Sequence, residues 1–107
     1  QFEGKYLMKI LVICSGGMST SMLVKAMSRA AEGMNEDIAV ESGSVSGLIN
    51  MIDKIDLIMV APQVRHRLEE IRNIADRYNK PVVLIEPQLY GLIDGKGVLN
   101  QALVTGK

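Results

Sequence analysis

The sequence predicts an α/β fold: a doubly wound, four-stranded parallel sheet in the order 2-1-3-4, with helices on both faces. Four apolar runs lack polar alternation, which is typical of strands buried on both faces. Helical patterns lie between these runs, and such alternation implies parallel strands. Right-handed crossovers then place the first strand in the centre, beside the point where the chain reverses direction across the sheet.

The expected strands are short apolar runs with few interruptions. The first, KILVI, is continuous and rich in β-branched side chains. The second, DIAV, is shorter and weaker, and the third, IDLIMV, is interrupted only by Asp56. The fourth, VVLI, follows Pro81. In chain order, the expected strands are 9–13, 37–40, 55–60 and 82–85.

The expected helices place apolar residues at a period of about 3.6. The first follows Thr20 and ends near Gly33 and Asn35, which suit a C-cap. A short second helix covers about 45–53, and Pro81 ends a third. The four expected inward faces, in chain order, are Leu23, Ala26, Met27, Ala30, Ala31 and Met34; Leu48, Ile49 and Ile52; Val64, Leu68, Ile71, Ala75 and Tyr78; and Val98, Leu99, Ala102 and Leu103.

Composition argues against several classes of protein. The chain has 107 residues, enough for one domain, and 12 basic residues balance 12 acidic ones. This balance argues against a nucleic-acid binder and against a polybasic membrane-surface protein. One cysteine excludes an internal disulfide, and one histidine without a His/Cys cluster argues against a metal site, so we expect no metal. We expect a single domain over 8–107, preceded at 1–7 by a cloning remnant or a disordered N-terminus.

The loop after the first strand carries the strongest signal for chemistry. It reads Cys-Ser-Gly-Gly-Met-Ser-Thr-Ser over residues 14–21, at the carboxyl end of the central strand, and a helix follows. Glycines allow successive backbone N–H groups to point inward, and the helix start adds further N–H groups and positive dipole. Such donors suit a tetrahedral dianion and also stabilise a thiolate. The pattern predicts a nucleophile beside a phosphate cradle.

The same loop also allows a simpler interpretation. A free cysteine is often a buried core residue, and the glycines then serve only a tight turn. The loop is not a nucleotide P-loop, because no lysine follows the glycines at the required place. The position at the switch point of the sheet favours function for Cys14.

The block ILVICSGGMSTSMLVKAM closely resembles the start of enzyme IIB of the bacterial phosphoenolpyruvate-dependent sugar phosphotransferase system, in its lactose/cellobiose/chitobiose class. The resemblance covers nearly the whole chain from Met8, through Val-Ala-Pro-Gln at 60–63 and Leu-Tyr-Gly-Leu-Ile-Asp-Gly at 89–95. The Cys-Ser-x-Gly-Met-Ser-Thr-Ser string is specific to the cellobiose-like members. Gly16 stands where many relatives have alanine.

The resemblance implies a phosphoryl carrier without a cofactor. Cys14 accepts a phosphoryl group from a phosphohistidine of enzyme IIA and passes it to a cellobiose- or chitobiose-like sugar, bound by the membrane component enzyme IIC. The protein is then a cytoplasmic protein-cysteine phosphotransferase that meets the membrane through enzyme IIC, with no nucleic-acid partner. The implied phosphate-binding loop is Ser15, Gly16, Gly17, Met18, Ser19, Thr20 and Ser21.

The sequence leaves two alternatives to the phosphoryl-carrier function. Low-molecular-weight protein tyrosine phosphatases share the strand–cysteine–loop–helix arrangement, but they read Cys-x5-Arg, and Thr20 stands at the arginine position here. Threonine cannot replace a bidentate guanidinium, and Asp94, in an Asp-Gly turn, is the only tempting general acid. The other alternative is a non-catalytic docking module.

Further residues carry weaker predictions. His66 is expected on the solvent side of the third helix, and Gln63 is a possible cleft residue whose amide reaches toward the loop. Tyr90 either lines the cleft or packs on it. Met18 and Met22 give the surface around Cys14 an apolar character that suits brief protein docking. Arg65 and Arg67 form a solvated face or contact a partner, and Met27 and Met34 belong to the core.

Overall fold

The computed structural model describes residues 8–15 and 18–105 of the chain. Its sheet has four parallel strands in the order β2-β1-β3-β4, which confirms the predicted topology. The expectation for residues 1–7 lies outside the described residues. The strands are β1 (Met8–Ile13), β2 (Ile38–Gly43), β3 (Leu57–Val60) and β4 (Val82–Leu84).

The two inner strands form the centre of the core. Every residue of 10–13 in β1 and of 57–60 in β3 is fully buried. Their registers pair Ile10 with Leu57 and Ile13 with Val60. At the start of this pairing, Asp56 binds the backbone of Lys9 twice, by its amide at 2.8 Å and by its carboxylate at 2.8 Å. The polar residue that interrupts the third run therefore aligns the two strands.

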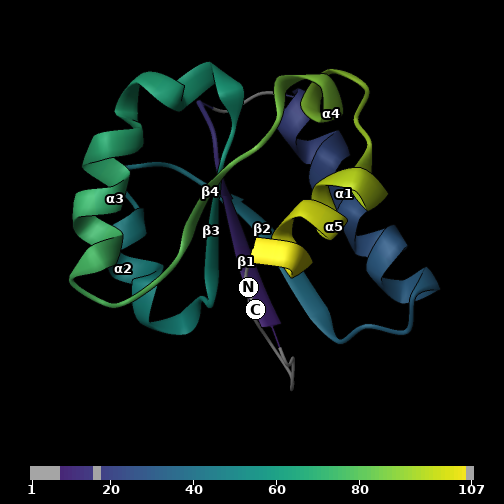
Figure 1. The fold of residues 1–107 in the computed structure, drawn as a ribbon, viewed down its shortest axis with the longest axis horizontal. Helices are drawn as coiled ribbons and strands as arrows, with labels where there is room; N and C mark the ends of the chain where they lie inside the picture. The colour runs from purple at the N-terminus through teal and green to yellow at the C-terminus, as the bar shows by residue number, and fades with distance from the viewer. Residues whose placement is uncertain (1–7, 16–17, 106–107) are drawn as a thin grey trace.

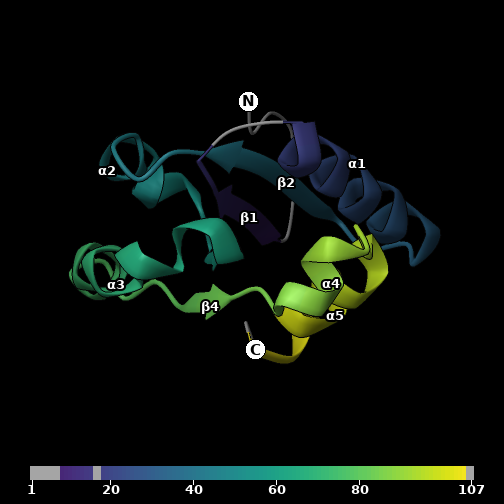
Figure 2. The ribbon, with the colours of Figure 1, turned by 90° about the horizontal axis from the view of Figure 1, so that it is seen from above.

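The helices cover both faces of the sheet (Figures 1 and 2). On one face lie α1, α4 and α5, and on the other lie α2 and α3. Short 3-10 segments, η1 and η2, precede β3 and α3 respectively. The bounds are α1 (Met18–Gly33), α2 (Leu48–Met51), η1 (Ile52–Lys54), η2 (Pro62–Arg67), α3 (Leu68–Asp76), α4 (Pro87–Gly91) and α5 (Gly95–Thr105).

Helix α1 matches the predicted helix closely. It begins at Met18, whereas the predicted helix follows Thr20, and it ends at Gly33. Beyond its end, Asn35 takes the left-handed conformation (φ 55°) that closes a helix, and the amide of Glu36 donates to the carbonyl of Ala31 at 2.9 Å. Met27 is fully buried and Met34 packs against the core, as predicted.

The second predicted helix was partly wrong. Residues 48–51 are helical, residues 52–54 form η1, and Val45 precedes both. Leu48 and Ile52 are fully buried, but Ile49 is 46% exposed. Residues four positions apart share a helix face, whereas the next residue is turned by about 100°. Ile49 therefore faces away from the sheet.

The third predicted helix is broken into two segments. Pro62 opens η2, and Val64 has non-helical dihedral angles (φ −115°, ψ 22°), so α3 begins only at Leu68. Tyr78 was predicted inward but is 38% exposed, because α3 ends at Asp76. The short helix α4 lies where the sequence predicted only a loop; it begins with a proline, which suits a first helical position.

Helix α5 approaches α1 with backbone contact at Gly95. A Cβ atom on Gly95 would lie 2.3 Å from the carbonyl carbon of Ala26 and 2.5 Å from its oxygen. Carbon atoms in ordinary contact are about 3.5–4.0 Å apart, so no side chain fits between the helices there. Gly95 thus sets the distance between α5 and α1.

We expect Gly95→Ala to lower the free energy of unfolding by roughly 3 kcal/mol, because the added methyl group must push two helix backbones apart. Urea denaturation followed by circular dichroism measures the change. The matched control is Gly33→Ala, since a Cβ there meets nothing within 4 Å. That variant should stay within about 1 kcal/mol of the wild type. Equal stability of the two variants would contradict the close approach at Gly95.

Candidate functional site

Cys14 lies directly after the central strand, at the carboxyl edge of the sheet. Its amide donates to the carbonyl oxygen of Gly43, the last residue of β2, at 3.1 Å. Its thiol donates to the same oxygen in a long contact of 3.9 Å. The side chain is 9% exposed, so the sulfur lies at the boundary between core and surface. The backbone hydrogen bond fixes Cys14 against the neighbouring edge strand.

Helix α1 starts four residues after this cysteine. Ser15 is exposed, as are Met18 and Ser19 in the first turn of α1. The first turn of a helix carries unpaired N–H groups and the positive end of the dipole, so this end of α1 favours an anion. Gly16 and Gly17, which the sequence placed in the phosphate cradle, lie outside the described residues.

A buried hydrogen bond joins two of the predicted site residues. The hydroxyl oxygens of Thr20 and Tyr90 are 2.8 Å apart, and the two side chains are 2% and 8% exposed. Thr20 belongs to the first turn of α1 and Tyr90 to α4. The chain thus brings together two residues that are 70 positions apart. Ser21, the other hydroxyl side chain at this end of α1, is exposed.

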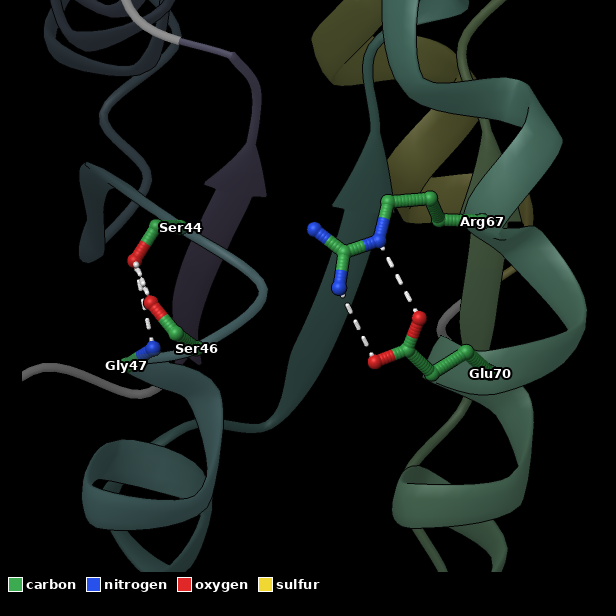
Figure 3. Close-up of polar contacts among 5 residues, drawn as sticks. All are labelled: Ser44, Ser46, Gly47, Arg67 and Glu70. Carbon is green, nitrogen blue, oxygen red and sulfur yellow. Dashed lines mark hydrogen bonds and ion pairs between the residues drawn. The ribbon is translucent and has the colours of Figure 1, made fainter.

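Two serines missed by sequence reasoning lie in the turn after β2. Figure 3 shows Ser44 and Ser46 with their hydroxyl groups toward each other, at 3.2 Å. The Ser44 hydroxyl also accepts the Gly47 amide at 3.1 Å. Because Cys14 binds Gly43, this polar turn continues from the strand that holds the cysteine. The Ser-Gly-Ser-Val-Ser-Gly string at 42–47, one residue after the second apolar run, is the signal that would have found it.

The segment after β3 places its polar side chains in solvent. Gln63 is exposed, and the described residues give its amide no hydrogen bond to the loop. His66 is exposed, as predicted. Arg67 forms a bidentate pair with Glu70 at 3.1 and 3.0 Å, with both side chains about half exposed (Figure 3). Such an exposed pair adds little stability, and it occupies the Arg67 guanidinium.

Asp94 has a structural role at the start of α5. Its carboxylate accepts the Gly97 amide at 2.9 Å, and its carbonyl accepts the Val98 amide at 2.9 Å. This is the hydrogen-bond pattern of an N-cap residue. The sequence left open whether Asp94 is a general acid or a turn residue, and the structure supports the turn.

The described residues form no cluster of potential metal ligands. Within residues 8–15 and 18–105, no group of three or more His, Cys, Asp and Glu side chains lies close enough to hold a metal ion. In the same part of the chain, no helix is long and apolar enough to cross a membrane. A depression of about 460 Å³ lies beside Glu86, Pro87 and Gln88, and none of these belongs to the cysteine loop.

Known proteins resemble this chain in sequence and fold. The family described as "PTS system, Lactose/Cellobiose specific IIB subunit" matches residues 9–101. The oligo-beta-mannoside-specific EIIB component of Bacillus subtilis (strain 168) is 36% identical over 95 residues, which are 89% of this chain and 92% of that one. The lactose-specific IIB component domain from Streptococcus pneumoniae has a TM-score of 0.85 at 25% identity, covering 96% of this chain and all of that one.

A third relative has a different organisation. The lactose-specific EIICB component of Streptococcus mutans is 32% identical over 92 residues, which are 84% of this chain but only 16% of the relative. This chain therefore corresponds to one part of that longer protein.

Fold and sequence similarity together define a sugar-specific component of a bacterial phosphotransferase system. The chain belongs to the lactose/cellobiose-specific IIB family of that system, as its resemblance implied.

We expect Asp94→Ala to lower the free energy of unfolding by about 1 kcal/mol, because the start of α5 loses its cap. Asp94→Asn should remain within a few tenths of a kcal/mol of the wild type, since asparagine caps about as well as aspartate. Urea denaturation of the three proteins measures both changes. An equal loss in the two variants would show that the carboxylate charge, rather than the cap, stabilises this region.

Proposed function

We propose that this protein is the phosphoryl carrier of a sugar phosphotransferase system and that Cys14 carries the phosphoryl group. The observation that supports this most is the position of Cys14. It ends the buried central strand and lies 9% exposed just before the first turn of α1. In open α/β sheets, ligands bind at the carboxyl ends of the strands beside the topological switch point, and β1 lies at that point here.

The proposed chemistry has two steps. First, the Cys14 thiolate attacks the phosphorus of a phosphohistidine on enzyme IIA; an S–P bond forms, the N–P bond breaks, and the imidazole nitrogen keeps the electron pair. Second, a hydroxyl of the sugar bound by enzyme IIC attacks the phosphorus of the phosphocysteine. An O–P bond forms, the S–P bond breaks, Cys14 leaves as thiolate with the electron pair, and the hydroxyl proton passes to water. Cysteine suits both steps because its thiolate is a good nucleophile and a good leaving group.

Charge stabilisation in this relay comes from hydrogen-bond donors. Phosphoryl transfer depends on positioning and electrostatic stabilisation more than on acid–base groups. We assign the phosphoryl oxygens to backbone amides of 15–20 and to hydroxyl donors at the start of α1. The helix dipole adds to this stabilisation at the same end of α1.

The phosphatase alternative is weaker. Threonine at position 20 leaves the loop without the arginine that clamps phosphate in tyrosine phosphatases. The carboxylate of Asp94 caps α5, which occupies the one candidate general acid. The docking-module alternative leaves the position of Cys14 unexplained.

We propose a cellobiose- or chitobiose-like sugar as the final acceptor. The similar proteins are named for oligo-β-mannosides and for lactose, so β-linked sugars recur among them. The EIICB name of the Streptococcus mutans relative supports enzyme IIC as the partner that presents the sugar. In the same scheme the carrier works on the cytoplasmic side and meets the membrane through enzyme IIC.

The decisive test is phosphorylation by the upstream relay. We expect the protein mixed with phosphoenolpyruvate, enzyme I, HPr and a cellobiose-type enzyme IIA to gain one phosphoryl group by intact mass. Cys14→Ser should gain none under the same conditions, since its hydroxyl is a far weaker nucleophile. Absence of phosphorylation together with hydrolysis of an aryl phosphate would favour the phosphatase. Absence of both activities would favour the docking module.

The surface for enzyme IIA is proposed to include two exposed methionines of α1. Met18 is 79% exposed and Met22 is 48% exposed, one turn apart. Residues four positions apart lie on the same helix face, so the two side chains form one apolar patch at the end of α1 that follows the cysteine. Flexible methionine side chains adapt to a partner surface, which suits a brief encounter.

We expect Met18→Ser to slow phosphoryl transfer from enzyme IIA roughly fivefold at a low concentration of the donor, because the patch loses its most exposed apolar side chain. Stopped reactions followed by intact mass measure the rate. The matched control is Val104→Ser, since Val104 is 82% exposed and the end of α5 lies far from the first turn of α1 (Figure 1). Equal rates for the two variants would exclude Met18 from the docking surface.

A further inference from the structure

The first turn of α1 contains one buried hydroxyl group. Ser19 and Ser21 are exposed, whereas Thr20 between them is 2% exposed. A buried hydroxyl needs hydrogen-bond partners, because an unsatisfied one costs free energy. The partner of Thr20 is the phenolic hydroxyl of Tyr90, at 2.8 Å, which is itself on a buried side chain. Burial thus distinguishes Thr20 from Ser19 and Ser21, which the sequence grouped with it as hydroxyl residues.

Tyr90 is held firmly from its own side of the contact. Its amide donates to the carbonyl of Glu86 at 3.0 Å, and its carbonyl accepts the amide of Ile93 at 3.0 Å. The next helix begins at Gly95, where backbone contact with Ala26 sets the distance between α5 and α1. The phenol therefore reaches Thr20 from a short helix whose position is fixed relative to α1.

The hydrogen bond between Thr20 and Tyr90 uses one of the two hydroxyl hydrogens, so the other can be donated to a further acceptor. Two hydroxyl groups carry two hydrogens, and the bond between them uses one. In the described part of the chain, neither hydroxyl makes a hydrogen bond other than this one. If the phenol donates to Oγ1 of Thr20, the threonine hydrogen is available for a second acceptor. A phosphoryl oxygen is a strong acceptor, and a chain of hydrogen bonds polarises each member.

We propose that Tyr90 is a positioning residue for phosphoryl transfer: it donates to Thr20, and Thr20 directs its own hydrogen to an oxygen of the phosphoryl group on Cys14. This inference rests on the proposed function. Thr20 lies six residues after Cys14, where the arginine of the phosphatase pattern would stand. A neutral hydroxyl oriented by a tyrosine thus replaces a charged clamp.

The test compares variants at the two partners. Thr20→Val removes the proposed donor but keeps its shape, Thr20→Ser keeps the hydroxyl, and Tyr90→Phe removes only the phenolic oxygen. Thr105→Val and Tyr78→Phe are the matched controls, because both side chains are exposed and neither belongs to the proposed phosphate-binding loop. The rate of phosphoryl transfer to Cys14 is measured at saturating phosphorylated enzyme IIA, and stability by urea denaturation.

We expect Thr20→Val to slow transfer roughly a hundredfold, as for the loss of one direct donor to a developing charge. Tyr90→Phe should slow it roughly tenfold, because the donor remains but is no longer oriented, while Thr20→Ser and both controls stay within about twofold of the wild type. The rate at saturating donor should fall without a matching rise in the donor concentration needed for half saturation. Alkylation of Cys14 by iodoacetamide should proceed at the wild-type rate in Tyr90→Phe.

The stability measurement separates positioning from a purely structural contact. Thr20→Val and Tyr90→Phe break the same bond, so a structural role predicts equal losses of rate as well as of stability. The inference would be overturned if the two variants lost transfer rate equally. It would also be overturned if Tyr90→Phe kept the wild-type rate or lost more rate than Thr20→Val. If Tyr90→Phe fails to fold, the comparison of Thr20→Ser with Thr20→Val decides, and equal slow rates overturn it. A wild-type protein that takes up no phosphoryl group would overturn the proposed function itself, and this inference with it.

Discussion

The pairing of β1 on both of its edges is the constraint on which the rest of this structure depends. β1 binds β2 over its full length and β3 over 10–13, and those four residues are fully buried. A strand in that position has no freedom to slip, because a shift by one residue would turn every side chain to the opposite face. The residue that follows it, Cys14, is thereby fixed at the carboxyl edge of the sheet.

A second constraint brings the end of the chain to the same region. Gly95 allows α5 to touch the backbone of α1, and Asp94 caps the helix that starts there. Ile93, just before it, takes a left-handed conformation (φ 52°), which is unusual for a β-branched residue and closes α4 sharply. This compact turn presents Tyr90 to Thr20. The first half of α1 is thus supported by residues distant in sequence.

The sequence predicted what depends on local pattern and missed what depends on tertiary contact. Apolar runs with few interruptions predicted the four strands and the position of Cys14, because burial on both faces leaves a direct signature, and right-handed crossovers predicted the strand order. The break at Val64 and the exposure of Ile49 were missed, since periodicity assumes a regular helix, whereas the second predicted helix is shorter and the third is broken. α4 was missed because five residues are too few for a period. The Thr20–Tyr90 contact spans 70 residues, and no spacing rule reaches that far.

A relay and a phosphatase place different demands on the same loop. A phosphatase gains from strong stabilisation of its transition state, and a charged guanidinium supplies it. A carrier must receive a phosphoryl group and release it again, so strong binding of the phosphocysteine would slow the second step. Hydroxyl and amide donors bind a phosphoryl group more weakly than an arginine fork does. If this chain is the proposed carrier, threonine at position 20, hydrogen-bonded to a buried tyrosine, matches the balance that reversible transfer needs.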